Sequence, residues 1–254
     1  PRPVRRQVTR PRFLLEVPGL GSVGIGAELV LDGEEGRHAA AVRRIRPGER
    51  IDVTDGAGRV ATCEVVGAER DRLALTVIGV ATVDPPRLRF VLVQALAKGG
   101  RDEAAVEAAT EVGVDAVVPW QAARSVVVWA GERGERSRRR WEATARAAAK
   151  QSRRAHLPEI RPTVDGAGLA RLVRAATMTL VLHEDATEPL TGVVLPEEGE
   201  VLLVVGPEGG LDPAEFDLLG AAGGRAVRLG SEVLRTSTAG PAAVVALAVR
   251  SGRW

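Results

Sequence analysis

The stretch from Val201 to Arg250 constrains the fold of this chain more than any other part of it. Its first segment, Val201 to Val205, is a continuous apolar run, as expected for a strand that is covered on both faces of a parallel sheet. The sequence GPEGG at positions 206–210 ends this strand, and Asp212 then supplies an N-cap for a helix over 212–222. A buried strand, a glycine turn and a capped helix in this order predict one unit of an α/β fold.

The same stretch contains a second loop. Residues 226–229 predict the next strand, and the polar sequence GSEVLRTST at 230–238 separates it from a final apolar helix. Because open α/β sheets bind ligands at the carboxyl ends of their strands, this polar loop and the glycine turn predict a ligand pocket at one edge of the sheet. Leu211 and Asp212 stand where a nucleotide-binding P-loop needs a lysine and a hydroxyl, so a nucleoside triphosphate is not the expected ligand.

Strands alternate with helices through the rest of the second half of the chain. Apolar runs predict strands over 89–96, 116–119, 125–129 and 178–182, and amphipathic segments predict helices over 102–112, 135–155 and 168–176. This alternation is typical of an α/β fold with a mostly parallel sheet. Adjacent prolines at Pro85 and Pro86 predict a linker, which divides the chain into domains of residues 1–82 and 83–254.

The first domain is predicted to be small and rich in strands. These cover 13–17, 28–31, 50–54, 59–66 and 73–80, with a hairpin turn at 55–58. One helix over 34–45 would bury Ala39, Val42 and Ile45 on one face. His38 and Arg43 would lie nearer solvent, either on a solvated helix face or at a nucleic-acid contact. GLGSVG at 19–24 fits a dinucleotide-binding pattern, but no helix follows it, so it is not expected to hold a cofactor.

One predicted helix carries most of the positive charge. Residues 133–154 contain nine basic residues and two acids, a local charge of +7 in a chain whose net charge is +2. Four of the cations recur at spacings that place them on one helix face: Arg139, Arg146, Lys150 and Arg153. Another face collects Trp141, Ala145 and Ala148. The basic face is either a solvated surface or a nucleic-acid contact, and its one-sided charge favours nucleic acid.

Several classes of function are not expected. Cys63 is the only cysteine, which excludes internal disulfides and cysteine-cluster metal sites and is typical of a small buried side chain in a strand. The three histidines lack metal-ligand spacing, so no metal site is predicted. No apolar run approaches the roughly 18 residues of a membrane span, and no apolar segment follows the basic N-terminus. A cytoplasmic protein without a membrane partner is therefore expected.

Six sequence blocks resemble, in order, those of one known family. GRHAAAVRRIRPGERI lies in the first domain, and QALAKGGRDEAAVEAATEVGV, PWQAARSVV, AAAKQSRRAHLPEI, VVGPEGGL and LGSEVLRTSTA follow in the second. They are similar to blocks of the RsmE family of SPOUT-class RNA methyltransferases. The resemblance implies a PUA-like RNA-binding barrel followed by a trefoil-knotted SPOUT domain, in a homodimer. It also implies methylation of N3 of a uridine in small-subunit (16S) ribosomal RNA with S-adenosyl-L-methionine, so the expected partner is ribosomal RNA or the small ribosomal subunit.

The resemblance also assigns residues position by position. Those expected to bind the cofactor are Leu182, His183, Gly206, Glu208, Gly209, Leu229, Gly230, Leu234, Arg235 and Thr236. Those expected to face RNA are Lys98, Arg124, Gln151, Arg153 and Arg154, to which the charge pattern adds Arg139, Arg146, Lys150, His38 and Arg43. Uridine N3 carries a proton and must become nucleophilic, so candidate catalytic residues are donors that stabilise negative charge on the uracil: Arg124, Arg154 or Arg235.

The resemblance leaves the general base and two other functions open. Many relatives have glutamates where this chain has Lys150 and Ser237, so neither position supplies the carboxylate that could act as the base. A SPOUT methyltransferase of another RNA, such as tRNA or large-subunit ribosomal RNA, would share every cofactor loop. A non-catalytic RNA-binding ribosome assembly factor could keep the fold and lack donor binding.

Overall fold

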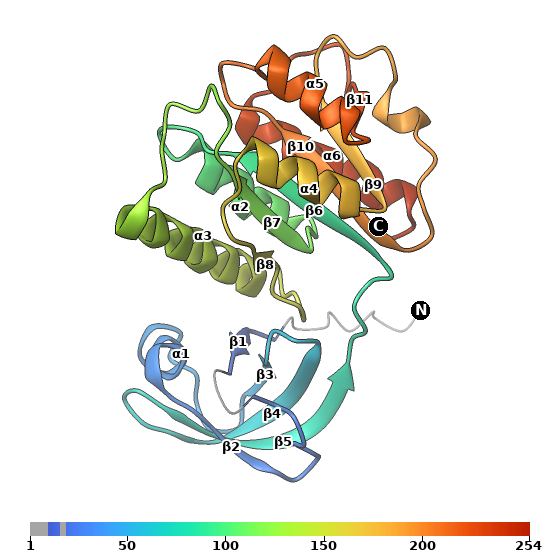
Figure 1. The fold of residues 1–254 in the computed structure, drawn as a ribbon. Helices are drawn as coiled ribbons and strands as arrows, with labels where there is room; N and C mark the ends of the chain where they lie inside the picture. The colour runs from blue at the N-terminus through green and yellow to red at the C-terminus, as the bar shows by residue number, and fades with distance from the viewer. Residues whose placement is uncertain (1–9, 16–18) are drawn as a thin grey trace. The chain divides into compact units, whose positions relative to one another are not determined.

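The computed structural model describes residues 10–15 and 19–254, and it divides the chain into two compact units. Unit 1 consists of the chain up to Pro85 together with Arg153–His156, and unit 2 consists of Pro86–Ser152 and Leu157–Trp254 (Figure 1). The segment Arg153–His156, which follows the basic helix in sequence, is therefore part of the N-terminal unit.

Unit 1 is built on a five-stranded sheet in the order β1-β3-β4-β5-β2. Its strands are β1 (Arg12–Leu14), β2 (Glu28–Leu31), β3 (Arg50–Thr54), β4 (Arg59–Ala68) and β5 (Leu73–Thr82). β1 runs parallel to β3, and the other pairs are antiparallel. Register shifts between β4 and β5 at Thr62/Cys63 and Val65/Gly67 bend these two long strands. All five predicted strands form, although the end of the one predicted over 13–17 lies outside the described residues.

Cys63 lies in the core of this sheet, as predicted. Its side chain is fully buried on β4 and packs among Phe13, Ile51 and Leu75. Burial, with a smaller contribution from the carboxylate of Asp52, raises the pKa of the Cys63 thiol to about 11. The thiol is therefore neutral at physiological pH and behaves as a small apolar side chain.

The helical segment of unit 1 differs from the prediction. A short α-helix, α1 (Gly33–Arg37), continues as a π-helix over His38–Val42, in place of one α-helix over 34–45. The wider π turn rotates the following residues, so Val42 is 69% exposed whereas Ala39 and Ile45 are buried. The prediction that Val42 is buried is therefore wrong. His38 and Arg43 are both exposed, as expected.

Unit 2 contains a six-stranded, fully parallel sheet in the order β11-β9-β10-β6-β7-β8. The strands are β6 (Leu88–Ala95), β7 (Ala116–Trp120), β8 (Glu159–Ile160), β9 (Met178–Leu182), β10 (Gly199–Val205) and β11 (Arg225–Val227). The helices are α2 (Arg101–Glu111), α3 (Gly131–Gln151), α4 (Gly166–Ala175), α5 (Pro213–Ala221) and α6 (Thr236–Arg250). The predicted α/β fold with a parallel sheet is confirmed.

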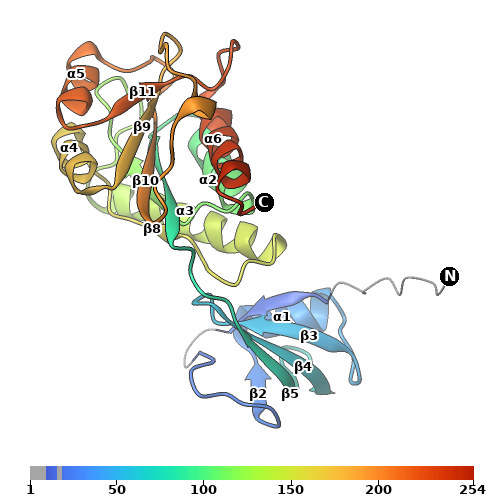
Figure 2. The ribbon, with the colours of Figure 1, turned by 90° about the vertical axis from the view of Figure 1, so that its right-hand side faces the viewer.

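Helices cover both faces of this sheet. Side chains of α2, α3 and α6 pack into one hydrophobic cluster, and side chains of α4 and α5 pack into another on the opposite face. Figure 2 shows α4 and α5 on one side of β9 and β10, with α6 and α2 on the other. The central strands β6 and β10 are buried almost throughout, which explains why they appear in the sequence as continuous apolar runs.

Two predicted elements of unit 2 differ from the structure. Residues 125–129 form no strand, because Val126 and Val128 point to solvent and the loop between β7 and α3 is closed by the side chain of Gln121. Gln121 Nε2 donates to the carbonyl of Val127 at 2.9 Å, and its Oε1 accepts from the N–H of Trp129 at 3.1 Å. The basic helix ends at Gln151 instead of Ala155, so Arg153, with φ near +57°, lies off the helical face predicted for it.

Candidate active site

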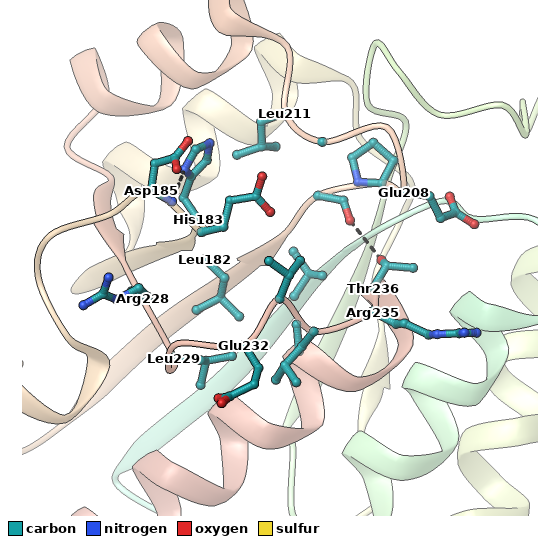
Figure 3. A pocket seen from close by; sticks show the side chains of 18 of the residues that line it. Leu182, His183, Asp185, Glu208, Leu211, Arg228, Leu229, Glu232, Arg235 and Thr236 are labelled. Atoms are coloured by element: carbon teal, nitrogen blue, oxygen red, sulfur yellow. Dashed lines mark hydrogen bonds between the residues drawn. The ribbon is translucent and has the colours of Figure 1, made fainter.

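A cavity of about 880 Å³ opens where β9, β10 and β11 end. Three segments form most of its wall, 182–185, 205–211 and 228–236, and Arg101 and Ala239 complete it (Figure 3). Each segment follows the carboxyl end of a parallel strand, as the position of the two loops in the sequence predicts. The volume lies in the range of about 300–1,000 Å³ that is usual for small-molecule sites.

All ten residues predicted to bind the cofactor line this one cavity. They are Leu182, His183, Gly206, Glu208, Gly209, Leu229, Gly230, Leu234, Arg235 and Thr236. Segments that are far apart in sequence are thus brought together at one edge of the sheet. Sequence reasoning missed other lining residues, among them Arg101, Asp185, Leu211, Arg228 and Glu232. The sequence feature that could have identified them is their position in loops that follow a glycine turn or a strand end.

The glycine turn is shaped by close packing and by its backbone conformation. A Cβ on Gly206 would lie 3.1 Å from Cδ2 of Leu211, and Gly210 has φ near +72°. The N–H of Gly210 donates to the carbonyl of Pro207 at 2.9 Å and closes the turn. Asp212 then caps α5 by accepting from the N–H of Ala214 at 3.0 Å, as predicted. The chain therefore bends sharply and exposes backbone groups to the cavity.

An ion pair forms part of the cavity wall. Nη1 of Arg101, at the start of α2, lies 2.9 Å from Oε1 of Glu208. Burial raises the pKa of the Glu208 carboxyl, but hydrogen bonds from its own N–H, from Arg101 and from the N–H of Lys98 outweigh burial, so the pKa lies below its ordinary value. Glu208 therefore stays ionised at neutral pH and ties the turn after β6 to the turn after β10.

His183 sits at the end of β9, against α5. Its ring centroid lies 4.8 Å from that of Phe216, and the N–H of Asp185 donates to Nδ1 at 3.2 Å. Because Nδ1 accepts this bond, the neutral ring carries its proton on Nε2. His183 can therefore donate a hydrogen bond to a ligand from Nε2.

The three candidate catalytic arginines occupy different places. Arg235 lines the cavity, at the N-cap position of α6. Arg124 does not line it, but its loop contacts the first turn of α5, where the N–H of Ala123 donates to Oε1 of Glu215 at 2.9 Å. Arg154 belongs to unit 1 through the segment Arg153–His156. Ser237 follows Thr236 on α6 and is not among the residues that line the cavity.

The residues predicted to face RNA fall in both units. Lys98, Arg139, Arg146, Lys150 and Gln151 belong to unit 2, and His38, Arg43, Arg153 and Arg154 belong to unit 1. On α3, Trp141, Ala145 and Ala148 are buried, which confirms the predicted apolar face. Arg138 pairs with Glu135 and Glu142, and Arg140 pairs with Glu103, whereas Arg139 is exposed and makes no ion pair with any described residue.

Residues 10–15 and 19–254 contain neither a metal-binding cluster nor a helix that could span a membrane. No group of three or more His, Cys, Asp and Glu side chains there could hold a metal ion. None of the helices in this part of the chain has both the length and the apolar character needed to cross a membrane.

Two family models match the chain. An RNA methyltransferase domain matches residues 84–248, and an RNA methyltransferase PUA domain matches residues 31–78. The first match contains the whole cavity wall, and the second covers most of the sheet of unit 1. Fold, cavity and both matches define the class of the protein as an RNA methyltransferase with an N-terminal PUA-like domain.

Relatives and solved structures narrow this class. Ribosomal RNA small subunit methyltransferase E of Mycobacterium tuberculosis is 48% identical over 233 residues, covering 90% of this chain and 89% of the relative. The protein of the same name from Bacillus subtilis is 30% identical and covers 82% of this chain and 85% of the relative. The structure of the Neisseria gonorrhoeae protein of that name, bound to S-adenosyl methionine, has a TM-score of 0.83 at 27% identity and covers 95% of this chain and 98% of its own. The chain belongs to the ribosomal RNA small subunit methyltransferase E family.

Proposed function

We propose that the protein transfers a methyl group from S-adenosyl-L-methionine to N3 of a uridine in small-subunit (16S) ribosomal RNA. The observation that carries this proposal is the gathering of ten predicted cofactor residues around one cavity at the ends of β9, β10 and β11. Two similar structures, from Neisseria gonorrhoeae and Legionella pneumophila, are described as bound to S-adenosyl methionine. The names of the relatives support the small-subunit substrate.

The chemistry of the cavity wall suits this donor. Leu182, Leu229 and Leu234 offer apolar surface, and the glycine turn offers backbone N–H and C=O groups. S-adenosylmethionine carries a sulfonium and an ammonium together with a carboxylate, and the wall contains both acids and arginines, such as Asp185, Glu232 and Arg235. When bound, the donor supplies an electrophilic methyl group.

The remaining chemistry belongs to the side chains of this chain. N3 of uridine must lose its proton, and negative charge then spreads over the uracil. Arg235, and Arg124 beside the glycine turn, would stabilise that charge as hydrogen-bond donors, with Arg154 as a third candidate. Exposed cations on α3, Arg139 foremost, would bind phosphates and position the RNA. The general base has no assigned residue, since the relevant positions hold Lys150 and Ser237.

Several further properties belong to the same proposal. Residues 1–82 would form the RNA-binding domain and 83–254 the methyltransferase domain, with 153–156 packed into the former. The protein would act as a cytoplasmic homodimer, and its second domain would carry the family's trefoil knot. Light scattering in solution tests the dimer directly.

The decisive experiment is methyl transfer from labelled S-adenosylmethionine to small-subunit RNA and to small subunits that lack the modification. Digestion to nucleosides and mass spectrometry should identify N3-methyluridine. Label in tRNA or large-subunit RNA alone would favour a methyltransferase of another RNA. If calorimetry detects no binding of S-adenosylmethionine, the result would favour a non-catalytic RNA-binding ribosome assembly factor.

A further inference from the structure

A buried amide lies directly behind the cavity, in the centre of the sheet. Gln94 is the penultimate residue of β6, is fully buried, and pairs in register with Val205, the last residue of β10. Its neighbours in the sheet are apolar, so an amide here carries a desolvation cost that a leucine would avoid. Gln94 itself is not among the residues that line the cavity.

The amide begins a chain of hydrogen bonds that reaches the cavity wall. Nε2 of Gln94 donates to Oγ1 of Thr236 at 2.8 Å and to the carbonyl of Ala95 at 3.1 Å. Oγ1 of Thr236 donates to the carbonyl of Gly206 at 2.9 Å, the bond drawn as a dashed line at Thr236 in Figure 3. Thr236 is only 7% exposed, so water does not compete freely for these bonds.

The chemistry of the three groups fixes which of them donates and which accepts in each of these hydrogen bonds. The carbonyl of Gly206 can only accept, so the single hydroxyl proton of Thr236 is used there. The hydroxyl must therefore accept from its other partner, the NH₂ group of Gln94. A flipped amide would turn Oε1 toward the carbonyl of Ala95, which would bring two acceptors together. The orientation of Gln94 is thus determined by its surroundings.

These hydrogen bonds join two segments of the cavity wall. Gly206 begins the glycine turn after β10, and Thr236 begins α6 directly after Leu234 and Arg235. α6 also packs closely on β6, since a Cβ on Gly240 would lie 2.7 Å from Cδ1 of Leu92. Gln94 therefore acts on both segments from a third element, directly on Thr236 and through it on Gly206, without lining the cavity.

We propose that Gln94 is a positioning residue for the donor pocket, and this rests on the proposed function. By supplying the proton that Thr236 accepts, it directs the threonine hydroxyl to Gly206 and holds the glycine turn and the start of α6 at the separation that fits the donor. Gln94→Met keeps the side-chain volume and removes the NH₂ group that donates to Thr236, so the threonine hydroxyl is free to rotate. Thr236→Val keeps the shape and removes the link to Gly206 altogether.

Calorimetry with S-adenosylhomocysteine tests this proposal on the full-length protein. We expect Gln94→Met to raise Kd about fivefold and Thr236→Val about tenfold, the effect of roughly one hydrogen bond each. Thr236→Ser, which keeps the hydroxyl, should stay within about twofold of wild type. Thr179→Val is the matched control, because Thr179 is a buried threonine of β9 whose hydroxyl has no partner among the described residues. Its Kd should be unchanged.

A double variant separates positioning from simple loss of stability. If Gln94 acts through Thr236, then Gln94→Met combined with Thr236→Val should bind no more weakly than Thr236→Val alone. Independent effects would multiply to about fiftyfold and overturn the proposal, as would wild-type affinity in Gln94→Met. If Gln94→Met does not fold, unchanged affinity in Thr236→Val overturns it. Failure of the wild-type protein to bind the ligand would instead refute the proposed function.

Discussion

Nη1 of Arg124 donates a hydrogen bond to the carbonyl oxygen of Gly209 at 3.2 Å, which joins the loop after β7 to the glycine turn of the cavity. Nε of the same guanidinium lies 3.6 Å from Oδ2 of Asp212. The side chain is about half exposed, so these contacts orient the guanidinium while part of it stays open to a substrate. A cation held in place in this way needs little reorganisation to stabilise a developing charge.

Arg124→Ala should lower kcat for methyl transfer by about 100-fold, the usual effect of removing one fixed donor to a developing negative charge. Affinity for the methyl donor should change little, because Arg124 does not line the cavity. Single-turnover experiments with labelled S-adenosylmethionine measure the rate of methyl transfer. Arg171→Ala is the control, since Arg171 is exposed on α4 and makes no ion pair with a described residue. Equal rates in the two variants would remove Arg124 from the mechanism.

Arg235 and Arg139 should affect different kinetic constants. Arg235→Ala removes a cation from the cavity wall and should lower kcat strongly, by about 100-fold. Arg139→Ala removes an exposed cation from α3, the proposed phosphate contact, and should mainly raise KM for RNA. It should also reduce the slope of log affinity against log salt by about 0.7 to 0.9. Turnover of Arg235→Ala near the wild-type value would be incompatible with its proposed role.

The C-terminal segment is anchored by a buried ion pair, and breaking this pair should destabilise unit 2. Arg253 contacts Asp115 through two bonds, at 2.7 and 3.1 Å, and the Asp115 side chain is only 7% exposed. Arg253→Ala leaves that carboxylate without the arginine and should lower the free energy of unfolding by about 3 kcal/mol. Arg87→Ala breaks the exposed pair with Glu198 and should cost less than about 0.5 kcal/mol. Thermal melts compare the two, and similar melting temperatures would contradict the prediction.

The pH dependence of stability should report on Glu200. Hydrogen bonds from Arg161, at 2.6 and 3.0 Å, are the main cause that lowers the pKa of this carboxyl from its ordinary 4.5. Because the folded-state pKa is the lower one, the stabilisation is complete above pH 4.5 and is lost as the pH falls through the folded-state value. Glu200→Gln should therefore be less stable than wild type at neutral pH, by about 1.5 kcal/mol. The difference in stability between the two proteins should vanish in strong acid. Thermal melts from pH 3 to 7 measure it, and a difference that stays the same at every pH would contradict the prediction.

Gly58 should be intolerant of any side chain. It has φ near +106°, and a Cβ there would lie 2.6 Å from both Cε1 of His156 and the carbonyl oxygen of Val83. Gly58→Ala should destabilise unit 1 by about 1–3 kcal/mol. Gly21→Ala is the control, because its Cβ would meet nothing within 4 Å and its φ is not positive. Hydrogen exchange of the β3 and β4 amides measures the effect within this unit.

Local pattern predicted most of the fold, since strands and capped helices depend on neighbouring residues. The exceptions have physical causes. Val126 and Val128 alternate like strand residues, but they pair with no strand in the part of the chain that the structure describes. No glycine or proline marks the end of α3, and the positive φ of Arg153 arises where the chain joins unit 1. The π-helix over His38–Val42 has no distinct sequence pattern.

Two loops of the cavity wall were predictable because they follow strand ends, whereas the individual residues, Leu182 and His183 of the third segment among them, were assigned from the family resemblance. The link from Gln94 to Thr236 was not predictable, since it joins residues 142 positions apart through side-chain hydrogen bonds. The ion pair of Arg101 was not predictable for the same reason: its partner Glu208 lies 107 positions away. Sequence spacing locates the loops, whereas the contacts that hold them together depend on the completed sheet.

The placement of Arg153–His156 in unit 1 has a consequence for synthesis of the chain. The N–H of Gly58 donates to the carbonyl of Ala155 at 3.0 Å, and Nε2 of His156 donates to the carbonyl of Val83 at 2.7 Å. The ribosome must therefore translate α2, β7 and α3 before these partners exist. Although N-terminal domains usually fold first as the nascent chain emerges, the first domain encoded here is completed only after α2, β7 and α3 of the second have been made.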